Sequence, residues 1–306
     1  MKNSATETLA SPLSSAFYAA VTALLLWSGT AIANKIAVGY MDGLTAGVLR
    51  SLLAGVFAMI IALAMQLPFP ASTRDRLLLA ASGVSSFAAW PILLSVGIVR
   101  TTAGHAALIM AMVPVFTVFI ATVIQRRLPG AGWWLGAVIA LTATTMLILS
   151  RGILLKMFDD GSSITGDLII LAGGLICAMG YVAGGKLSPR IGTVATTFWG
   201  LSIALVILVP VFGVIAGHTA WTAVPQQAWL AIAWMTLLSS LGGYALWFYA
   251  LGRGGISRIG SLQLMMPVLT LAAAALMLGE TLTLFLAATC SAIIFGTYLA
   301  HRYATE

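Results

Sequence analysis

Charged side chains are scarce in this chain. Asp, Glu, Lys and Arg make up 8% of its 306 residues, whereas a soluble domain carries about 25%. Apolar residues make up 60%, so the sequence predicts a membrane protein rather than one or two soluble domains. The 15 Lys and Arg residues stand singly or in pairs at the ends of apolar runs. This pattern argues against a nucleic-acid partner and favours membrane lipids.

Cysteine and histidine are also rare. Cys177 and Cys290 lie inside apolar runs without a CxxC partner, and His105, His218 and His301 are far apart, with no acidic partner at helical spacing. No metal site, nucleophile–base pair or phosphate-binding loop is predicted. We therefore expect neither an enzyme nor a cofactor, and the chain has no soluble domain that would bind ATP.

Acidic residues are absent from the middle of every apolar run. All eight lie in tails, loops or segment ends, namely Glu7, Asp42, Asp75, Asp159, Asp160, Asp167, Glu280 and Glu306. Proton-driven antiporters place a titratable acid within the membrane. The pattern therefore favours a facilitator that runs downhill, with proton coupling through His105 as the alternative.

Apolar runs long enough to cross a bilayer follow one another along the chain. A spanning helix needs about 20 such residues, and ten runs qualify, which predicts an all-α membrane protein of ten transmembrane helices. The first run is too long for the core of a signal peptide. The runs cover residues 17–38, 44–66, 77–99, 102–125, 132–150, 164–186, 194–217, 227–251, 256–278 and 281–301.

Positive charges in the short loops predict the orientation, because Lys and Arg collect on the cytoplasmic side. With the N-terminus inside, ten face the cytoplasm, namely Lys2, Arg74, Arg76, Arg126, Arg127, Lys186, Arg190, Arg253, Arg258 and Arg302. Five face outwards, namely Lys35, Arg50, Arg100, Arg151 and Lys156. Both termini are therefore expected in the cytoplasm. Arg50 lies within the second run, where we expect its side chain to snorkel to the surface.

The two halves of the chain resemble each other. A shift of 151 residues places Gly29, Ala33 and Lys35 on Gly180, Gly184 and Lys186, and a shift of 153 places residues 111–115 on 264–268. Five helices duplicated give an inverted repeat, because five is odd; many secondary transporters use such repeats for alternating access. Chance similarity between apolar segments is the alternative. The predicted organisation is a tail (1–16), two repeats (17–150 and 164–302), an external linker (151–163) and a tail (303–306).

Short motifs at matching places resemble the drug/metabolite transporter superfamily, specifically its EamA type. In the second half, Met266-Pro267-Val268 is followed by Leu278-Gly279-Glu280-Thr281-Leu282. The first half has Met112-Val113-Pro114-Val115, but Gln125-Arg126-Arg127-Leu128 stands where the Gly-Glu pair belongs. Within the superfamily, the chain looks most like bacterial aromatic amino-acid exporters of the YddG type. The resemblance implies ten helices, cytoplasmic termini and efflux of aromatic compounds through a central cavity.

Small residues and prolines recur at matching places in the two halves. Gly29 with Ala33, and Gly180 with Gly184, have the spacing that lets membrane helices approach closely, so we expect them to serve the packing of helices. In the functional interpretation, close contact between the first and sixth helices would form a seam on which the halves rock. Pro114 and Pro267 interrupt backbone hydrogen bonding in mid-helix, and the pairing predicts hinges or bent helices beside a cavity.

Polar and aromatic side chains inside the apolar runs are the candidate substrate-binding residues, because polarity facing lipid is costly. Aromatic walls would suit aromatic cargo, although the Trp and Tyr members could instead anchor helices at the membrane interface or pack in the core. The candidates are Trp27, Asn34, Trp90, His105, Tyr181, Tyr244, Trp247, Ser261 and Gln263.

The sequence thus predicts a multi-pass exporter in a bacterial inner membrane. Its expected substrates are aromatic amino acids or related amphipathic metabolites, carried by alternating access without a cofactor. The alternatives are a proton-coupled efflux transporter of broad specificity, and a channel or membrane sensor. The sequence does not specify the oligomeric state, and a monomer is compatible with it.

Overall fold

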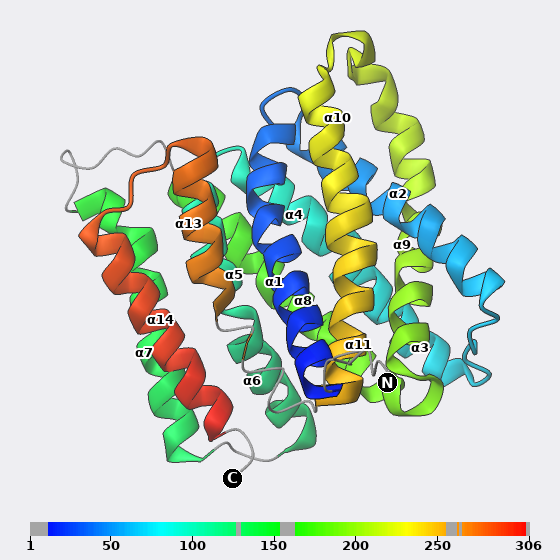
Figure 1. The fold of residues 1–306 in the computed structure, drawn as a ribbon, viewed down its shortest axis with the longest axis horizontal. Helices are drawn as coiled ribbons and strands as arrows, with labels where there is room; N and C mark the ends of the chain where they lie inside the picture. The colour runs from blue at the N-terminus through cyan, green and yellow to red at the C-terminus, as the bar shows by residue number, and fades with distance from the viewer. Residues whose placement is uncertain (1–11, 127–129, 154–162, 255–261, 263–264, 304–306) are drawn as a thin grey trace, which may run out of the picture.

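Helices account for all the regular secondary structure in the part of the chain that the computed structural model describes, residues 12–126, 130–153, 163–254, 262 and 265–303 (Figure 1). The first half contains α1 (Pro12–Ala37), α2 (Gly43–Ala64), α3 (Thr73–Ser82), η1 (Gly83–Ala89), α4 (Trp90–Ile98), α5 (Ala103–Met110), α6 (Val113–Gln125) and α7 (Ala131–Ile153). The second contains α8 (Ile164–Ile191), α9 (Thr193–Ile215), η2 (Ala216–His218), η3 (Trp221–Ala223), α10 (Gln226–Ala233), η4 (Trp234–Gly243), α11 (Tyr244–Gly254), α13 (Met266–Leu278) and α14 (Leu284–Arg302).

Eight helices of the described chain are long and apolar enough to cross a membrane, and α13 and α14 are shorter apolar helices. Four of the eight are composite: α3 continues through η1 into α4, α5 is followed by α6, α9 continues into η2, and α10 continues through η4 into α11. Each of the ten predicted runs overlaps one of these segments. The expectation of a polytopic α-helical membrane protein is therefore confirmed, while the count of ten crossings depends on the two shorter helices.

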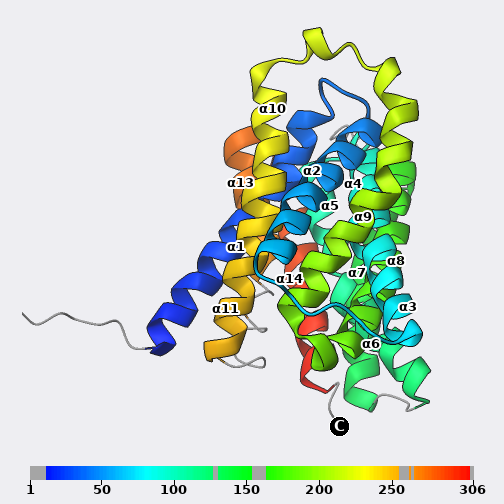
Figure 2. The ribbon, with the colours of Figure 1, turned by 90° about the vertical axis from the view of Figure 1, so that its right-hand side faces the viewer.

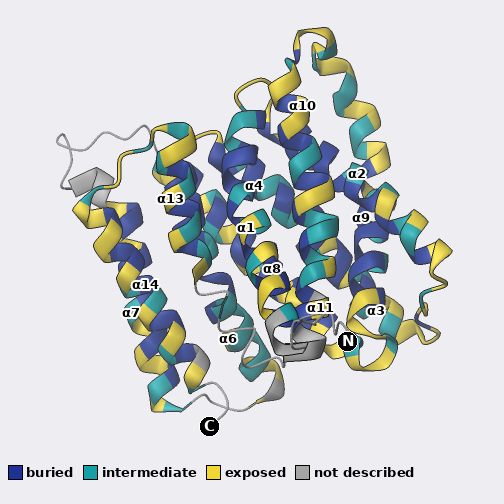
Figure 3. Cartoon of the chain, viewed as in Figure 1, coloured by how far each residue is buried: buried dark blue, intermediate teal, exposed yellow. Residues whose placement is uncertain are grey.

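The helices stand side by side in one bundle, and α1 begins and α14 ends at the same face (Figures 1 and 2). Pairs α2 with α9 and α7 with α14 pack closely at opposite ends of the bundle in Figure 1. The outer surface is apolar: Leu276 and Leu284 are each 87% exposed, and exposed residues follow the outer helix faces in Figure 3. Such a surface suits lipid rather than water.

Irregular backbone recurs at matching places in the two halves. The wide π-helical turns η1 and η4 begin 151 residues apart, at Gly83 and Trp234, and α6 and α13 begin 153 residues apart, at Val113 and Met266. Pro114 and Pro267 lie in the first turn of α6 and α13, where the missing N–H breaks no helical hydrogen bond. Pro114 therefore begins a new helix after the turn at residues 111–112 instead of bending a continuous one, and Pro267 likewise stands at the start of α13.

The C-terminal ends of α6 and α13 also match. Arg126 (φ 54°) and Gly279 (φ 68°), 153 residues apart, both take the left-handed conformation that ends a helix. Glycine adopts it freely, whereas a residue with a Cβ is strained by about 1 kcal/mol. The first half thus keeps the backbone of the Gly-Glu motif at Arg126 although its side chains are different.

Contacts between backbones hold the bundle together. A Cβ added to Gly296 of α14 would lie 2.6 Å from the amide nitrogen of Ala140 and from the carbonyl oxygen of Gly136, both on α7. A Cβ added to Gly55 of α2 would likewise lie 2.7 Å from the carbonyl oxygen of Leu201 on α9. Lipid chains are as apolar as the helices, so close packing at small residues provides much of the association energy.

We expect Gly296→Ala to lower the free energy of unfolding by about 1–3 kcal/mol, because the new methyl group would force the α7 and α14 backbones apart. Gly213→Ala in α9 is the matched control. No atom lies within 4 Å of its added Cβ, and alanine favours a helix over glycine by about 1 kcal/mol. Thermal unfolding of the two variants in detergent checks this, and equal midpoints would contradict it.

Candidate functional site

A cavity of about 430 Å³ lies between the two halves of the chain. Ten helical segments contribute to its wall, some of them parts of the same membrane span. They are α1, α2, α4, α5 and α6 of the first half and α8, η4, α11, α13 and α14 of the second. The wall combines aromatic rings, aliphatic side chains, two methionines and a few polar groups. It consists of Trp27, Thr30, Arg50, Trp90, Leu94, Ala107, Met110, Ala111, Val113, Pro114, Thr117, Val118, Cys177, Tyr181, Ser239, Ser240, Tyr244, Met266, Pro267, Thr270, Ile294 and Thr297.

Trp27 is the centre of an aromatic cluster on one side of the cavity. Its ring centroid lies 5.4 Å from that of Tyr244 and 5.3 Å from that of Trp247. Its indole N–H donates to the carbonyl oxygen of Ser239 at 2.9 Å, and the Thr30 and Ser239 hydroxyl oxygens lie 2.7 Å apart. These bonds connect α1 to the π-helix η4, so the cluster holds the two halves together and also presents rings to the cavity.

Six of the residues singled out from the sequence line this cavity: Trp27, Trp90, Tyr181, Tyr244, Pro114 and Pro267. Three of the other substrate candidates do not. Asn34 is fully buried and accepts a hydrogen bond from the Ser95 hydroxyl at 2.9 Å, Trp247 packs behind Trp27, and His105 belongs to a second polar cluster. Ser261 and Gln263 lie outside the described residues.

Gly29 and Gly180 pack across the two halves, but not against each other's helices. A Cβ on Gly29 would lie 3.0 Å from the Trp234 ring of η4, and a Cβ on Gly180 would lie 2.9 Å from the Cβ of Ser85 in η1. Each glycine thus makes room for the π-helix of the opposite half. The seam between α1 and α8 in the functional interpretation is replaced by two matching contacts, α1 with η4 and α8 with η1.

Arg50 was not proposed as a site residue from the sequence, and the expectation that it snorkels is wrong. Its side chain lines the cavity and the residue is only 8% exposed. The buried Nη1 atom has no hydrogen-bond partner, and no carboxylate of the described residues lies within salt-bridge distance. The sequence contained a signal for this role, because Arg50 is a lone cation inside an apolar run. In membrane proteins such a residue is by default a candidate for a functional position.

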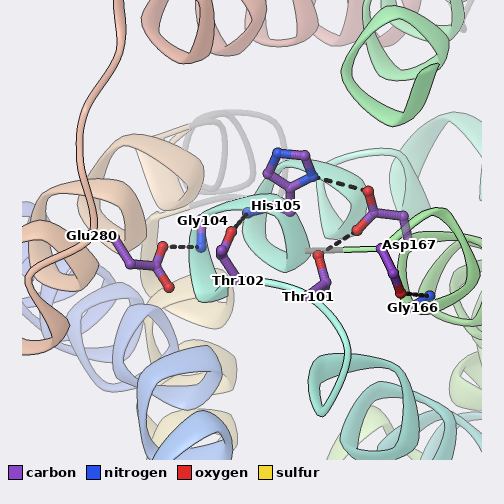
Figure 4. Close-up of polar contacts among 8 residues, drawn as sticks. Thr101, Thr102, Gly104, His105, Gly166, Asp167 and Glu280 are labelled. Atoms are coloured by element: carbon purple, nitrogen blue, oxygen red, sulfur yellow. Dashed lines mark hydrogen bonds and ion pairs between the residues drawn. The ribbon is translucent and has the colours of Figure 1, made fainter. Parts of the chain in front are cut away.

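A second polar cluster lies where α5 and α8 begin (Figure 4). Nδ1 of His105 lies 2.9 Å from Oδ2 of Asp167, and the Thr101 hydroxyl donates to Oδ1 of the same carboxylate at 2.5 Å. Asp167 is fully buried and His105 is 3% exposed. The sequence shows no acidic partner for His105 at helical spacing, and the structure places one 62 residues away, which only the packing of two helix N-termini brings near.

Glu280 joins this cluster from the other half of the chain. Its carboxylate accepts hydrogen bonds from the backbone N–H groups of Ala103 and Gly104 at 2.7 and 2.9 Å, which caps the N-terminus of α5. A carboxylate is favourable there because the first N–H groups of a helix are unpaired. Lys35 Nζ donates to the carbonyl oxygens of Ile98 and Thr101 at 2.9 and 2.6 Å, so α1 is tied to the same place.

The fold, the apolar exterior and the central cavity define the chain as a multi-pass α-helical membrane protein. Its sequence matches the EamA-like transporter family twice, over residues 14–149 and 164–302. The chain belongs to this family. The name of the family indicates a transporter rather than an enzyme.

Relatives at moderate identity are transporters as well. The uncharacterized transporter YdeK of Bacillus subtilis is 29% identical over 92% of this chain and 95% of its own length. The probable amino-acid metabolite efflux pump of Salmonella typhimurium is 26% identical over 92% and 93%. The probable terminal-alkyne amino-acid exporter of Streptantibioticus cattleyicolor is 25% identical over 88% and 87%. These names support membrane transport of small metabolites, and they do not single out the YddG type.

A crystal structure with a similar arrangement of helices covers almost the whole chain. The two superpose with a TM-score of 0.63 over 95% of this chain and 98% of the other, at 19% sequence identity. At this identity the likeness applies to the fold alone. It shows that the helix arrangement described above occurs in a protein whose structure was determined by experiment.

We expect Glu280→Gln to lower the free energy of unfolding by about 1–2 kcal/mol, because the neutral amide loses the charge-assisted bonds that cap α5. Asp75→Asn is the control. It removes an equal charge from the partly exposed ion pair between Asp75 and Arg190, and surface pairs of this kind contribute at most about 1 kcal/mol. Thermal unfolding in detergent measures both variants; a larger loss for Asp75→Asn would contradict the assignment.

Proposed function

We propose that this chain exports amino acids and related amphipathic metabolites across a bacterial inner membrane by alternating access, with aromatic side chains favoured. The observation that carries the proposal is the cavity between the halves, whose wall combines the Trp27, Trp90, Tyr181 and Tyr244 rings with two methionines. Aromatic rings bind other rings edge-on or offset, and methionine adapts to varied shapes. The amino-acid exporters among the relatives agree with this substrate class.

The proposed topology has ten transmembrane helices in two inverted repeats, residues 17–150 and 164–302, with residues 151–163 outside and both termini in the cytoplasm. Support comes from the double family match and from the paired features: η1 with η4, the α6 and α13 starts, and the left-handed ends at Arg126 and Gly279. The start of α1 and the end of α14 at one face require an even number of crossings (Figure 1).

In this topology the cluster of Figure 4 lies at the outer end of the cavity. Lys35, Glu280 and the His105–Asp167 pair join α1, α5, α8 and the segment after α13. We propose that these bonds hold the outer side closed and that they break when the halves rock to release substrate. The contacts of Gly29 with η4 and of Gly180 with η1 are the surfaces on which the halves move.

The mode of energy coupling has two candidates. No carboxylate belongs to the described residues that line the cavity, which favours a facilitator that moves substrate down its gradient. The second candidate, a proton-coupled exporter, is favoured by one observation: Asp167 and His105 form a buried pair of titratable groups, and such pairs serve as proton relays in transporters.

Trp90→Ala should reduce the uptake of labelled L-phenylalanine by proteoliposomes at least about tenfold, because Trp90 is a half-buried ring in the cavity wall and truncating an aromatic contact residue costs several kcal/mol. Trp134→Ala is the control. Trp134 is 43% exposed and lies outside the cavity wall, so this variant should transport as the wild type does. Counterflow of the labelled amino acid separates a carrier from a pore. Equal rates for the two variants would remove Trp90 from the site.

Wild-type proteoliposomes should release preloaded L-phenylalanine at the same rate with and without a pH gradient, because a facilitator needs only the substrate gradient. Asp167→Asn should then change the rate equally under both conditions. Accumulation of the amino acid against its own gradient when a pH gradient is imposed would reject the facilitator. If Asp167→Asn also abolished that accumulation, the proton-coupled alternative would be established.

A further inference from the structure

We propose that Arg50 binds the carboxylate of the transported molecule, so that the substrates are organic acids with an apolar body and their amino group is dispensable. The inference rests on the proposed transport function and names a chemical requirement of the same cavity. Arg50 is the eighth residue of the second membrane segment, α2, which begins at Gly43, and it lies at the cavity wall.

The burial of Arg50 is the first part of the argument. Transferring a guanidinium ion from water to a protein interior costs several kcal/mol unless a counter-ion or hydrogen bonds compensate. Only 8% of the surface of Arg50 is exposed, and its Nη1 atom has no hydrogen-bond partner. A planar guanidinium with unused N–H groups is the side chain that binds a carboxylate best, because its donors match the two oxygens.

The charge of the cavity is the second part. Among the described residues that line it, none is Asp or Glu and Arg50 is the cation. The other polar side chains among them are hydroxyls, a thiol and indoles, which are uncharged groups in their ordinary form. The described part of the wall therefore offers one positive charge without a fixed negative one. An anionic ligand would supply the missing charge, whereas a cationic amine would be repelled.

The third part of the argument is that the neighbours of Arg50 combine polar and apolar side chains. Its carbonyl oxygen accepts from the Thr236 hydroxyl of η4 at 3.4 Å, and Ser239 and Ser240 of the same π-helix also line the cavity. The hydroxyls and the guanidinium thus come from adjoining elements, while Met110 and Met266 contribute apolar wall from α5 and α13. Such a wall fits a molecule with one anionic end and one apolar end. The described part of the wall contains no carboxylate that would require an ammonium group.

Binding of a matched pair of ligands tests the proposal on purified protein in detergent. N-acetyl-L-phenylalanine and N-acetyl-L-phenylalaninamide both lack the ammonium group and differ in having a carboxylate or a neutral amide. We expect the wild type to bind the carboxylate at least about tenfold more tightly, as for one charge-assisted contact. Arg50→Gln should reduce this ratio to within about twofold while it binds the amide as the wild type does, which also shows that the variant is folded.

Two further variants separate binding from a structural role. Arg50→Lys keeps the charge without the planar fork and should keep an intermediate preference for the carboxylate. Arg100→Gln removes one exposed positive charge from the loop after α4 and should keep the wild-type ratio. A merely structural Arg50 would instead change the affinities for both ligands equally.

The results that overturn the inference are distinct from those that overturn the proposed function. Equal wild-type affinities for the two ligands, retention of the tenfold ratio by Arg50→Gln, or binding of L-phenylalanine but of neither acetylated compound would each overturn the role of Arg50. If proteoliposomes nevertheless carry L-phenylalanine, the proposed transport function stands. If they carry no amino acid and the protein binds neither ligand, both fail.

Discussion

The structure depends on one constraint: inside a bilayer no water is present to pair with a backbone N–H or C=O group. Regular helices satisfy these groups within one segment, and irregular backbone is tolerated only where protein or a cavity surrounds it. The departures from α-helix obey this rule. The break between α5 and α6 and the start of α13 at Met266 line the cavity, as do Ser239 and Ser240 of η4.

The same constraint explains how the two halves are joined. Close packing and internal hydrogen bonds replace the hydrophobic effect as the source of association. Glycine allows a π-helix of one half to approach a helix of the other, at Gly29 and at Gly180. Hydrogen bonds between the halves add directional contacts: the Trp27 indole donates to η4, and the Glu280 carboxylate caps α5. Both kinds of contact are local and reversible, which is what a protein that rocks around a central site requires.

Arg50 and the His105–Asp167 pair represent two solutions to the cost of buried charge. His105 and Asp167 compensate each other within hydrogen-bond distance, at the place where two helices begin and backbone N–H groups are available. Arg50 has no such compensation among the described residues. Evolution retains an uncompensated charge in a membrane protein for function more often than for stability, and in this chain the charge faces the cavity between the halves.

The sequence by itself determined that this protein lies in a membrane, where its apolar segments are and that its halves are similar, because segment length and hydropathy are local properties. It also indicated four of the aromatic residues that line the cavity. The partner of His105, the cavity position of Arg50 and the glycine contacts with η1 and η4 were decided only in the tertiary structure. Each depends on which helix faces become neighbours, and segments of nearly uniform hydrophobicity contain little information about their rotation.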